Sequence, residues 1–153
     1  MLPAAVHVVT LGAHDLPTLR DFYERLGWTV VIAVDDFAAF ETGGAVLTLW
    51  PLDRLAADGQ VPMPAPTTEM RGVTLGIIVA AASEVDEAID AARRAGARIT
   101  KEPVAPAEFD GRHAHFADPE GNLWEVVWLG EGPQAGAGMA ELVRRASGSP
   151  RAS

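Results

Sequence analysis

A single carboxylate lies within a strongly apolar stretch near the end of this 153-residue chain. Leu123, Glu125 and Val127 alternate there with two tryptophans and a valine, which is the pattern of a half-buried β-strand. A buried ionised group is costly unless it is paired, bound to a metal or protonated. Glu125 is therefore the first candidate for chemistry, as a cation ligand, a hydrogen-bond acceptor for a ligand, or a general base. The alternative is a carboxylate without function, satisfied by a neighbouring hydroxyl or arginine.

Histidines are the other candidates for metal or acid–base chemistry. His113 and His115 share one face of a predicted strand, and a His-x-His pattern can bind metal. If His115 and His7 both face Glu125, the three side chains make a two-histidine, one-carboxylate metal set. The alternative for each is a packed, hydrogen-bonded or solvent-facing histidine. His14 lies in a turn before a predicted helix, where we expect it to be exposed.

Composition excludes several classes of function. The chain has 21 acidic and 12 basic residues and a net charge of −9, which argues against a nucleic-acid or anionic-membrane partner and favours neutral or cationic ligands. It has no cysteine, which excludes disulfides, thiol nucleophiles, zinc–thiolate sites and iron–sulfur ligation. We find no signal peptide and no apolar run long enough to cross a bilayer, and we expect a cytoplasmic protein.

The elements that must position these residues occur twice in the same order. Hydrophobic periodicity and turn residues predict a strand, a helix and three more strands in the first part of the chain: 6–11, 15–26, 28–34, 37–41 and 45–50. They predict the same order in the second part: 73–79, 83–95, 97–102, 111–117 and 122–128. Ser83 and Asp86 form a capping-box pattern at the start of the second helix.

Two stretches make the repeat explicit. Residues 40–50 and 116–128 both contain an aromatic residue, a turn with glycine and an apolar strand that ends in tryptophan. Four residues after the last glycine of the turn stand Thr48 in the first stretch and Glu125 in the second. An internal repeat of this kind predicts an α+β fold of two tandem βαβββ modules with curved mixed sheets.

The predicted domain organisation follows from the repeat. The first module spans residues 1–50, a proline-rich linker with one short helix at 52–57 spans 51–72, and the second module spans 73–130. The tail, 131–153, is predicted to form one short amphipathic helix containing Met139, Leu142 and Val143, and to be disordered from about residue 147.

Two motifs carry a resemblance to a known family. Phe22-Tyr23-Glu-Arg-Leu26-Gly27-Trp28 lies in the first module, and Asp118-Pro-Glu-Gly-Asn-Leu-Trp-Glu125 lies in the second. With the βαβββ repeat, they resemble the vicinal-oxygen-chelate superfamily of glyoxalase I, extradiol dioxygenases, and bleomycin- and fosfomycin-resistance proteins. The resemblance covers residues 6–129 and implies two half-cups that form a ligand cavity, within one chain or between two chains of a homodimer.

The resemblance also implies where a metal would bind. Metalloenzymes of this family place one ligand on the first and one on the last strand of each module, and the matching positions are Val8, Thr48, Thr74 and Glu125. Iron, nickel, zinc and manganese sites need three or four histidine or carboxylate ligands, and Glu125 alone is of that kind. We therefore expect no bound cofactor, and a small-molecule cavity lined by Val8, Thr48, Trp50, Thr74, His115 and Glu125.

Three functions follow from these expectations. The first is a metal-free small-molecule binding protein, similar to drug-sequestering bleomycin-resistance members, for a cationic or flat aromatic compound. The second is a metal-dependent glyoxalase-like lyase or isomerase, or a dioxygenase, with iron, nickel, zinc or manganese on His7, His115 and Glu125. The third is a metal-free enzyme that uses Glu125 as a general base on a small carbonyl compound. The shortage of metal ligands favours the first, and the sequence leaves open whether the chain is an enzyme.

Overall fold

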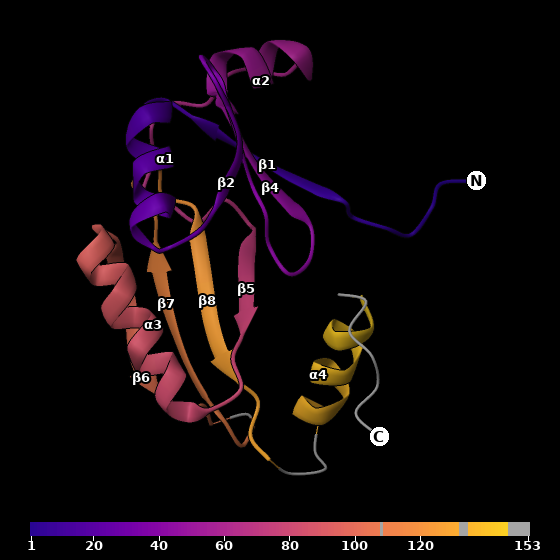
Figure 1. Cartoon of the computed structure of the whole chain (residues 1–153), viewed down its shortest axis with the longest axis vertical. Helices are drawn as coiled ribbons and strands as arrows, with labels where there is room; N and C mark the ends of the chain where they lie inside the picture. The colour runs from indigo at the N-terminus through magenta and orange to yellow at the C-terminus, as the bar shows by residue number, and fades with distance from the viewer. Residues whose placement is uncertain (108, 132–134, 147–153) are drawn as a thin grey trace. The chain divides into compact units, whose positions relative to one another are not determined.

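The computed structural model describes residues 1–107, 109–131 and 135–146 of the chain. By contacts the chain divides into two compact units, Met1–Glu69 and Met70–Ser153. Each unit contains one four-stranded mixed sheet and its own helices, as Figure 1 shows. The α+β fold of two βαβββ repeats is therefore confirmed. The predicted disorder from residue 147 lies outside the described residues.

The first unit is built around sheet A, whose strands lie in the order β1-β4-β3-β2. Its elements are β1 (Val8–Ala13), α1 (Leu16–Arg25), β2 (Val30–Val34), β3 (Phe37–Phe40), β4 (Val46–Pro51) and α2 (Leu52–Asp58). β1 runs parallel to β4, and the other pairs are antiparallel. The Asp15 carboxylate caps α1 by accepting from the Thr18 N–H at 3.1 Å.

Sheet A has a buried face and an exposed face. Leu47 and Leu49 of β4 are buried on the side where α1 packs, whereas Val46 points to the opposite side and is exposed. The strand pairing places three further exposed apolar residues on the face of Val46: Val8, Ile32 and Val34. Leu52 and Leu55 of α2 lie against Gly12 at one end of this face. We call this surface, with its exposed apolar side chains, the open face of sheet A.

The second unit is built around sheet B, whose strands lie in the order β5-β8-β7-β6. Its elements are β5 (Thr74–Ile78), α3 (Ala82–Ala95), β6 (Arg98–Val104), β7 (Arg112–Ala117), β8 (Leu123–Trp128) and α4 (Ala135–Ala146). β5 runs parallel to β8, and the other pairs are antiparallel. Figure 1 shows α3 along one face of this sheet, where it contacts β6, β7 and β8.

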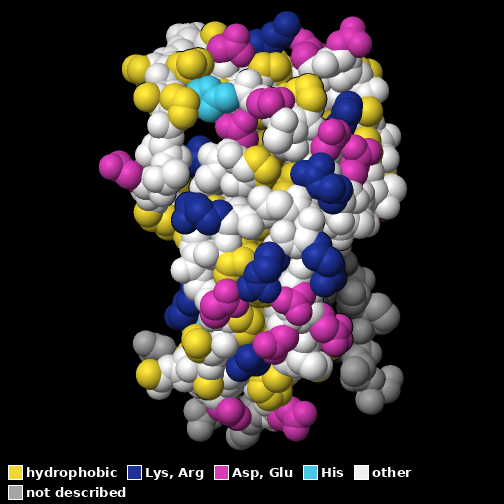
Figure 2. All heavy atoms as spheres, turned by 90° about the vertical axis from the view of Figure 1, so that its left-hand side faces the viewer, with side chains coloured by type: hydrophobic (Ala, Val, Ile, Leu, Met, Phe, Trp, Pro, Cys, Tyr) yellow, Lys and Arg dark blue, Asp and Glu magenta, His cyan; other side chains and the backbone are white. Residues whose placement is uncertain are grey.

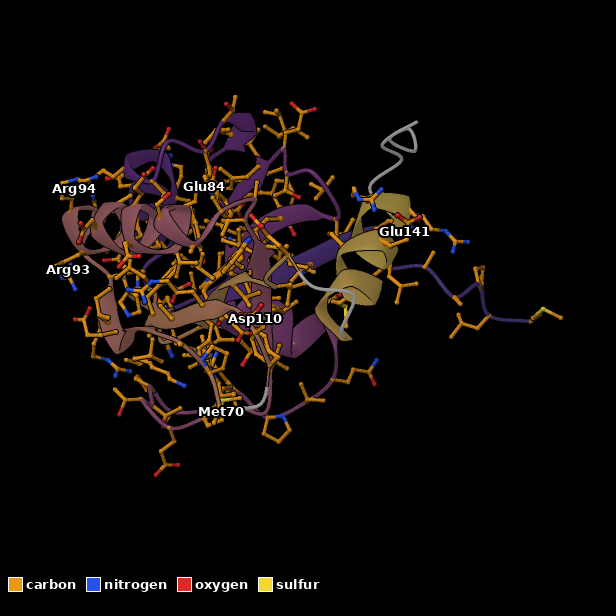
Figure 3. The ribbon with its side chains drawn as sticks, turned by 90° about the horizontal axis from the view of Figure 1, so that it is seen from below. Met70, Glu84, Arg93, Arg94, Asp110 and Glu141 are labelled. Atoms are coloured by element: carbon orange, nitrogen blue, oxygen red, sulfur yellow. The ribbon has the colours of Figure 1, made fainter. Side chains whose placement is uncertain are left out.

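The start of α3 differs from the predicted capping box. The helix begins at Ala82, and the side chain that reaches back is Glu84, whose Oε2 accepts from the Ala80 N–H at 2.8 Å. Figure 3 shows Glu84 near one end of α3 and Arg93 near the other, the arrangement that complements the helix dipole. The capping box was wrong because Asp86 turns to Arg112 on the sheet instead.

A tight turn between β7 and β8 fixes how these two strands pair. Asp118 is 4% exposed, and its carboxylate accepts from the Glu120 N–H at 3.0 Å and from the Asn122 N–H at 2.9 Å. Gly121 has a φ of 82°, a conformation that favours glycine. Arg71 donates to the Glu120 carbonyl at 2.9 Å and so ties the chain before β5 to this turn. The turn sets the register in which His115 faces Glu125.

Candidate functional site

The two faces of sheet B carry different side chains. Arg112 lies on the face that α3 covers, where it binds Asp86 of the helix. Phe116 and Trp124 stack on the same face with ring centroids 6.2 Å apart, and both are buried. Because side chains alternate along a strand, His113, His115 and Glu125 lie on the opposite face. We call this second surface the open face of sheet B.

Three of its side chains form one cluster. His113 Nδ1 lies 3.1 Å from Glu125 Oε1, and His115 Nε2 lies 3.8 Å from the same oxygen. Each of the three side chains offers one atom that could bind a metal ion, and these three atoms all lie within 4.8 Å of one another. Glu125 is 32% exposed, and the two histidines are less exposed at 12% and 21%. The cluster is therefore recessed and reachable from solvent at the carboxylate.

Lys101 of β6 extends the cluster. Its Nζ lies 2.8 Å from His113 Nε2. An ammonium group only donates, so His113 Nε2 accepts and the proton of the neutral ring is on Nδ1. His113 Nδ1–H then donates to Glu125 Oε1, and a hydrogen-bonded row runs from Lys101 through His113 to Glu125. This row fixes both the tautomer of His113 and the orientation of the carboxylate.

The surroundings of His115 disfavour its charged form. Burial lowers the pKa of His115 below its usual value, the nearby His113 and Lys101 lower it further, and the Glu125 carboxylate opposes them. Its Nδ1 atom is buried and has no hydrogen-bond partner among the residues that the structure describes. A neutral imidazole offers a lone pair to a hydrogen-bond donor or to a metal.

The space beside Glu125 is open. Gly76 of β5 is the strand partner of Glu125, and a Cβ placed on Gly76 would meet no atom within 4 Å. Thr74 lies two residues earlier on the same face, pairs with Leu123 and is exposed. The space next to Glu125, where Gly76 has no side chain, is therefore unfilled.

The predicted site residues of the first unit are arranged differently. Thr48 is 5% exposed, and its hydroxyl oxygen lies 2.7 Å from that of Thr10. Val8 is exposed at the start of β1, and Trp50 is half-buried near the end of β4. His7 precedes β1 and is exposed, as is His14.

The four positions that the family resemblance gives do not fit a metal. Val8 offers no ligand atom, and the Thr48 hydroxyl is engaged with Thr10. Within the second unit, it is His113, weighed in the sequence as half of His-x-His, that joins His115 at Glu125. We derive no chemical step through a metal held by Val8, Thr48, Thr74 and Glu125.

Sequence reasoning missed Lys101 and Gly76. Two irregularities in the pairing of β6 with β7, between Ile99 and Lys101 and between Lys101 and Val104, bring Lys101 to the cluster. Such irregularities leave no clear pattern in the sequence. The signal for Gly76 was present, because a glycine inside a strand indicates a close approach or missing bulk.

The wider surface offers less specific features. Figure 2 shows basic and acidic side chains interspersed over one face of the molecule, without a large patch of either sign on that face. None of the helices within the described residues combines the length and the apolar character that crossing a membrane requires.

Comparison with known proteins places this geometry in a family. A model of the Glyoxalase/Bleomycin resistance protein/Dioxygenase superfamily matches residues 5–126. The chain belongs to this superfamily. The family resemblance inferred from the two motifs is thereby confirmed. A search of curated proteins found no match.

Solved structures agree with the assignment to the glyoxalase/bleomycin resistance/dioxygenase superfamily. A glyoxalase-related enzyme from Fulvimarina pelagi is 30% identical, with 82% of this chain and 88% of that chain covered and a TM-score of 0.73. A superfamily member from Nocardioides is 26% identical, with 88% and 89% covered and a TM-score of 0.74. A lactoylglutathione lyase from Agrobacterium tumefaciens, at 20% identity with 82% and 94% covered and a TM-score of 0.61, shares the fold.

Proposed function

We propose that this superfamily member binds a small organic molecule on the open face of sheet B, beside Gly76 and Glu125. The observation that carries the proposal is the pairing of a partly exposed carboxylate with a glycine whose missing side chain leaves open space. Ligand sites combine such space with a few well-placed polar groups. Lys101 and His113 supply that placement by holding Oε1 of Glu125 in one orientation.

The chemistry of the site favours a ligand with a cationic or N–H group. The carboxylate of Glu125 accepts hydrogen bonds, and a charged acceptor binds a cationic donor more strongly than a neutral one. The net charge of −9 attracts cations to the protein as a whole. A ligand of this kind suits a drug-sequestering role, in which the protein binds one compound stoichiometrically without turnover.

The test is a binding screen of the full chain against cationic aromatic compounds, including bleomycin, and neutral flat compounds of similar size. Tryptophan fluorescence and thermal shift report binding, and isothermal titration gives the stoichiometry. Gly76→Val fills the space beside Glu125 and should abolish binding. Gly43→Val is the matched control, because Gly43 also has open space around its Cβ position but lies in the first unit. Equal loss in both variants, or no loss in either, would contradict the proposed location.

A second candidate function rests on the hydrogen bond between His113 and Glu125. With Oε1 of Glu125 engaged by His113, a substrate meets a carboxylate of fixed orientation that can accept a proton. This is acid–base catalysis on a small carbonyl compound. Turnover of a dicarbonyl or hydroxycarbonyl panel in the presence of a chelator, lost about 10²–10⁴-fold in Glu125→Gln while binding persists, would support catalysis over sequestration. An unchanged rate in that variant would exclude Glu125 as the base.

A further inference from the structure

We propose that His113, His115 and Glu125 bind one divalent transition-metal ion within the second unit. This site differs from the positions on the first and last strands of both modules, since two of its three ligands come from β7 and all three lie in sheet B. It does not depend on the proposed small-molecule function, which needs only the carboxylate and the open space.

The backbone already places the three ligands correctly. His113 and His115 are two residues apart on one strand and point to the same side, and His115 is the direct strand partner of Glu125. The turn at Asp118 pins this register. Because all three ligands project from paired strands, bringing a metal between them requires side-chain rotation and no movement of the sheet.

The distances between the ligand atoms are close to those found around a bound metal ion. In a tetrahedral site with metal–ligand bonds of about 2.1 Å, ligand atoms lie about 3.4 Å apart. The two histidine nitrogens lie 3.1 and 3.8 Å from Glu125 Oε1, on either side of this value. The widest separation in the cluster, up to 4.8 Å, closes by a rotation of the imidazole rings.

The ligand types select the metal. Two imidazoles and one carboxylate suit Zn²⁺, Co²⁺, Ni²⁺ and Fe²⁺, whereas Ca²⁺ and Mg²⁺ prefer oxygen ligands. Three protein ligands leave a fourth position of a tetrahedral ion unfilled. Glu125 is 32% exposed, so solvent or a ligand can reach the cluster.

Lys101 opposes the metal and supplies a signature for the test. Its ammonium lies against His113 Nε2, so it repels a cation at the other ring nitrogen and keeps the proton on the Nδ1 atom that would bind the metal. Replacing it with an uncharged side chain removes both effects. Lys101→Met should therefore bind metal about tenfold more tightly than the natural sequence.

The experiment uses metal-free full-length protein titrated with Zn²⁺ and Co²⁺. Isothermal titration should give one ion per chain, and Co²⁺ should give the visible absorption of a tetrahedral complex. His113→Gln, His115→Gln and Glu125→Gln should each weaken binding by at least about tenfold. His7→Gln and His14→Gln are the matched controls and should bind as the natural sequence does, because both histidines lie outside the cluster.

Three results would overturn the proposal. They are no binding of either metal, undiminished binding in the three cluster variants, or loss of binding in His7→Gln, which would indicate the set of His7, His115 and Glu125. A gain of affinity in Lys101→Met, with the fold of the variant checked by circular dichroism, supports the site even if a cluster variant is unstable. Screening organic ligands in the presence of a chelator keeps the failure of this proposal distinct from failure of the proposed function.

Discussion

The hydroxyl oxygens of Thr10 and Thr48 lie 2.7 Å apart where β1 runs parallel to β4. The corresponding strand pair in the second unit, β5 and β8, joins Gly76 to Glu125. Two hydroxyls satisfy one another, whereas a carboxylate beside a glycine keeps an open neighbouring space. The same strand pairing thus places two mutually hydrogen-bonded hydroxyls in the first module and a carboxylate beside open space in the second.

Filling the space at Gly76 should abolish ligand binding without lowering the stability of the fold. Gly76→Val adds a β-branched side chain to a strand residue that has no neighbouring atom within 4 Å of its Cβ position. We expect the free energy of unfolding to stay level or rise by about 0.5–1 kcal/mol, because the unfolded chain loses conformational freedom. Urea unfolding measures this change. A large loss of stability would show that the space beside Glu125 is needed for packing rather than for a ligand.

The turn before β8 should be more sensitive than its surface position suggests. Asp118→Ala removes the carboxylate that accepts hydrogen bonds from two backbone N–H groups and from the Asn122 side chain. We therefore expect the free energy of unfolding to fall by about 2–4 kcal/mol. Asp118→Asn keeps one acceptor oxygen and should lower the free energy of unfolding by less. Urea unfolding of both variants checks the order, and equal losses would contradict a hydrogen-bonding role for the carboxylate.

The sequence predicted the fold well because the information is local and repeated. Helix 15–26 and the strand that contains Glu125 follow from periodicity and turn residues, and the repeat joined them into two modules. The cluster was predicted only in part. Parity placed His113 and His115 on one strand face and left open whether His115 faces Glu125, whereas Lys101 reaches the cluster through two irregularities in strand pairing. Those depend on tertiary packing, which a strand pattern does not encode.

An ion pair between α3 and sheet B should make stability depend on pH in the acid range. Arg112 donates two hydrogen bonds of 2.7 Å to Asp86 and thereby lowers the pKa of that carboxyl below its usual value. A carboxyl with a lowered folded-state pKa stabilises the protein above its unfolded pKa of about 3.9, and the stabilisation is lost as pH falls through the folded-state pKa. The ion pair therefore stabilises the fold at neutral pH, and this stabilisation is lost in acid.

The measurement compares the natural sequence with Asp86→Asn by urea unfolding from about pH 7 to about pH 3. The side chains of Arg112 and Asp86 are 31% and 48% exposed, so solvent screens the pair and the difference at neutral pH should be no more than about 1 kcal/mol. It should shrink toward zero below about pH 4. A difference that stays constant across this range would mean that Asp86 contributes through packing rather than charge.

The open face of sheet A leads to a prediction about assembly. Four apolar side chains on it are 38–60% exposed: Val8, Ile32, Val34 and Val46. Several exposed apolar side chains on one sheet face mark an interaction site, and we expect a second copy of the chain to cover it. The mass measured by light scattering should then be twice 16.1 kDa. Ile32→Lys places a charge on this face at β2, the edge strand of sheet A, and should reduce the mass to that of one chain, because burying an unpaired charge is costly.

Ser83→Lys is the control for that experiment. It adds the same charge at an exposed position of α3, in the second unit, and should leave the mass unchanged. Because the charge change is identical, a shift confined to Ile32→Lys assigns the effect to the apolar face and not to the reduction in net charge. A single-chain mass for the natural sequence, or a twofold mass that persists in Ile32→Lys, would show that this face does not pair two copies.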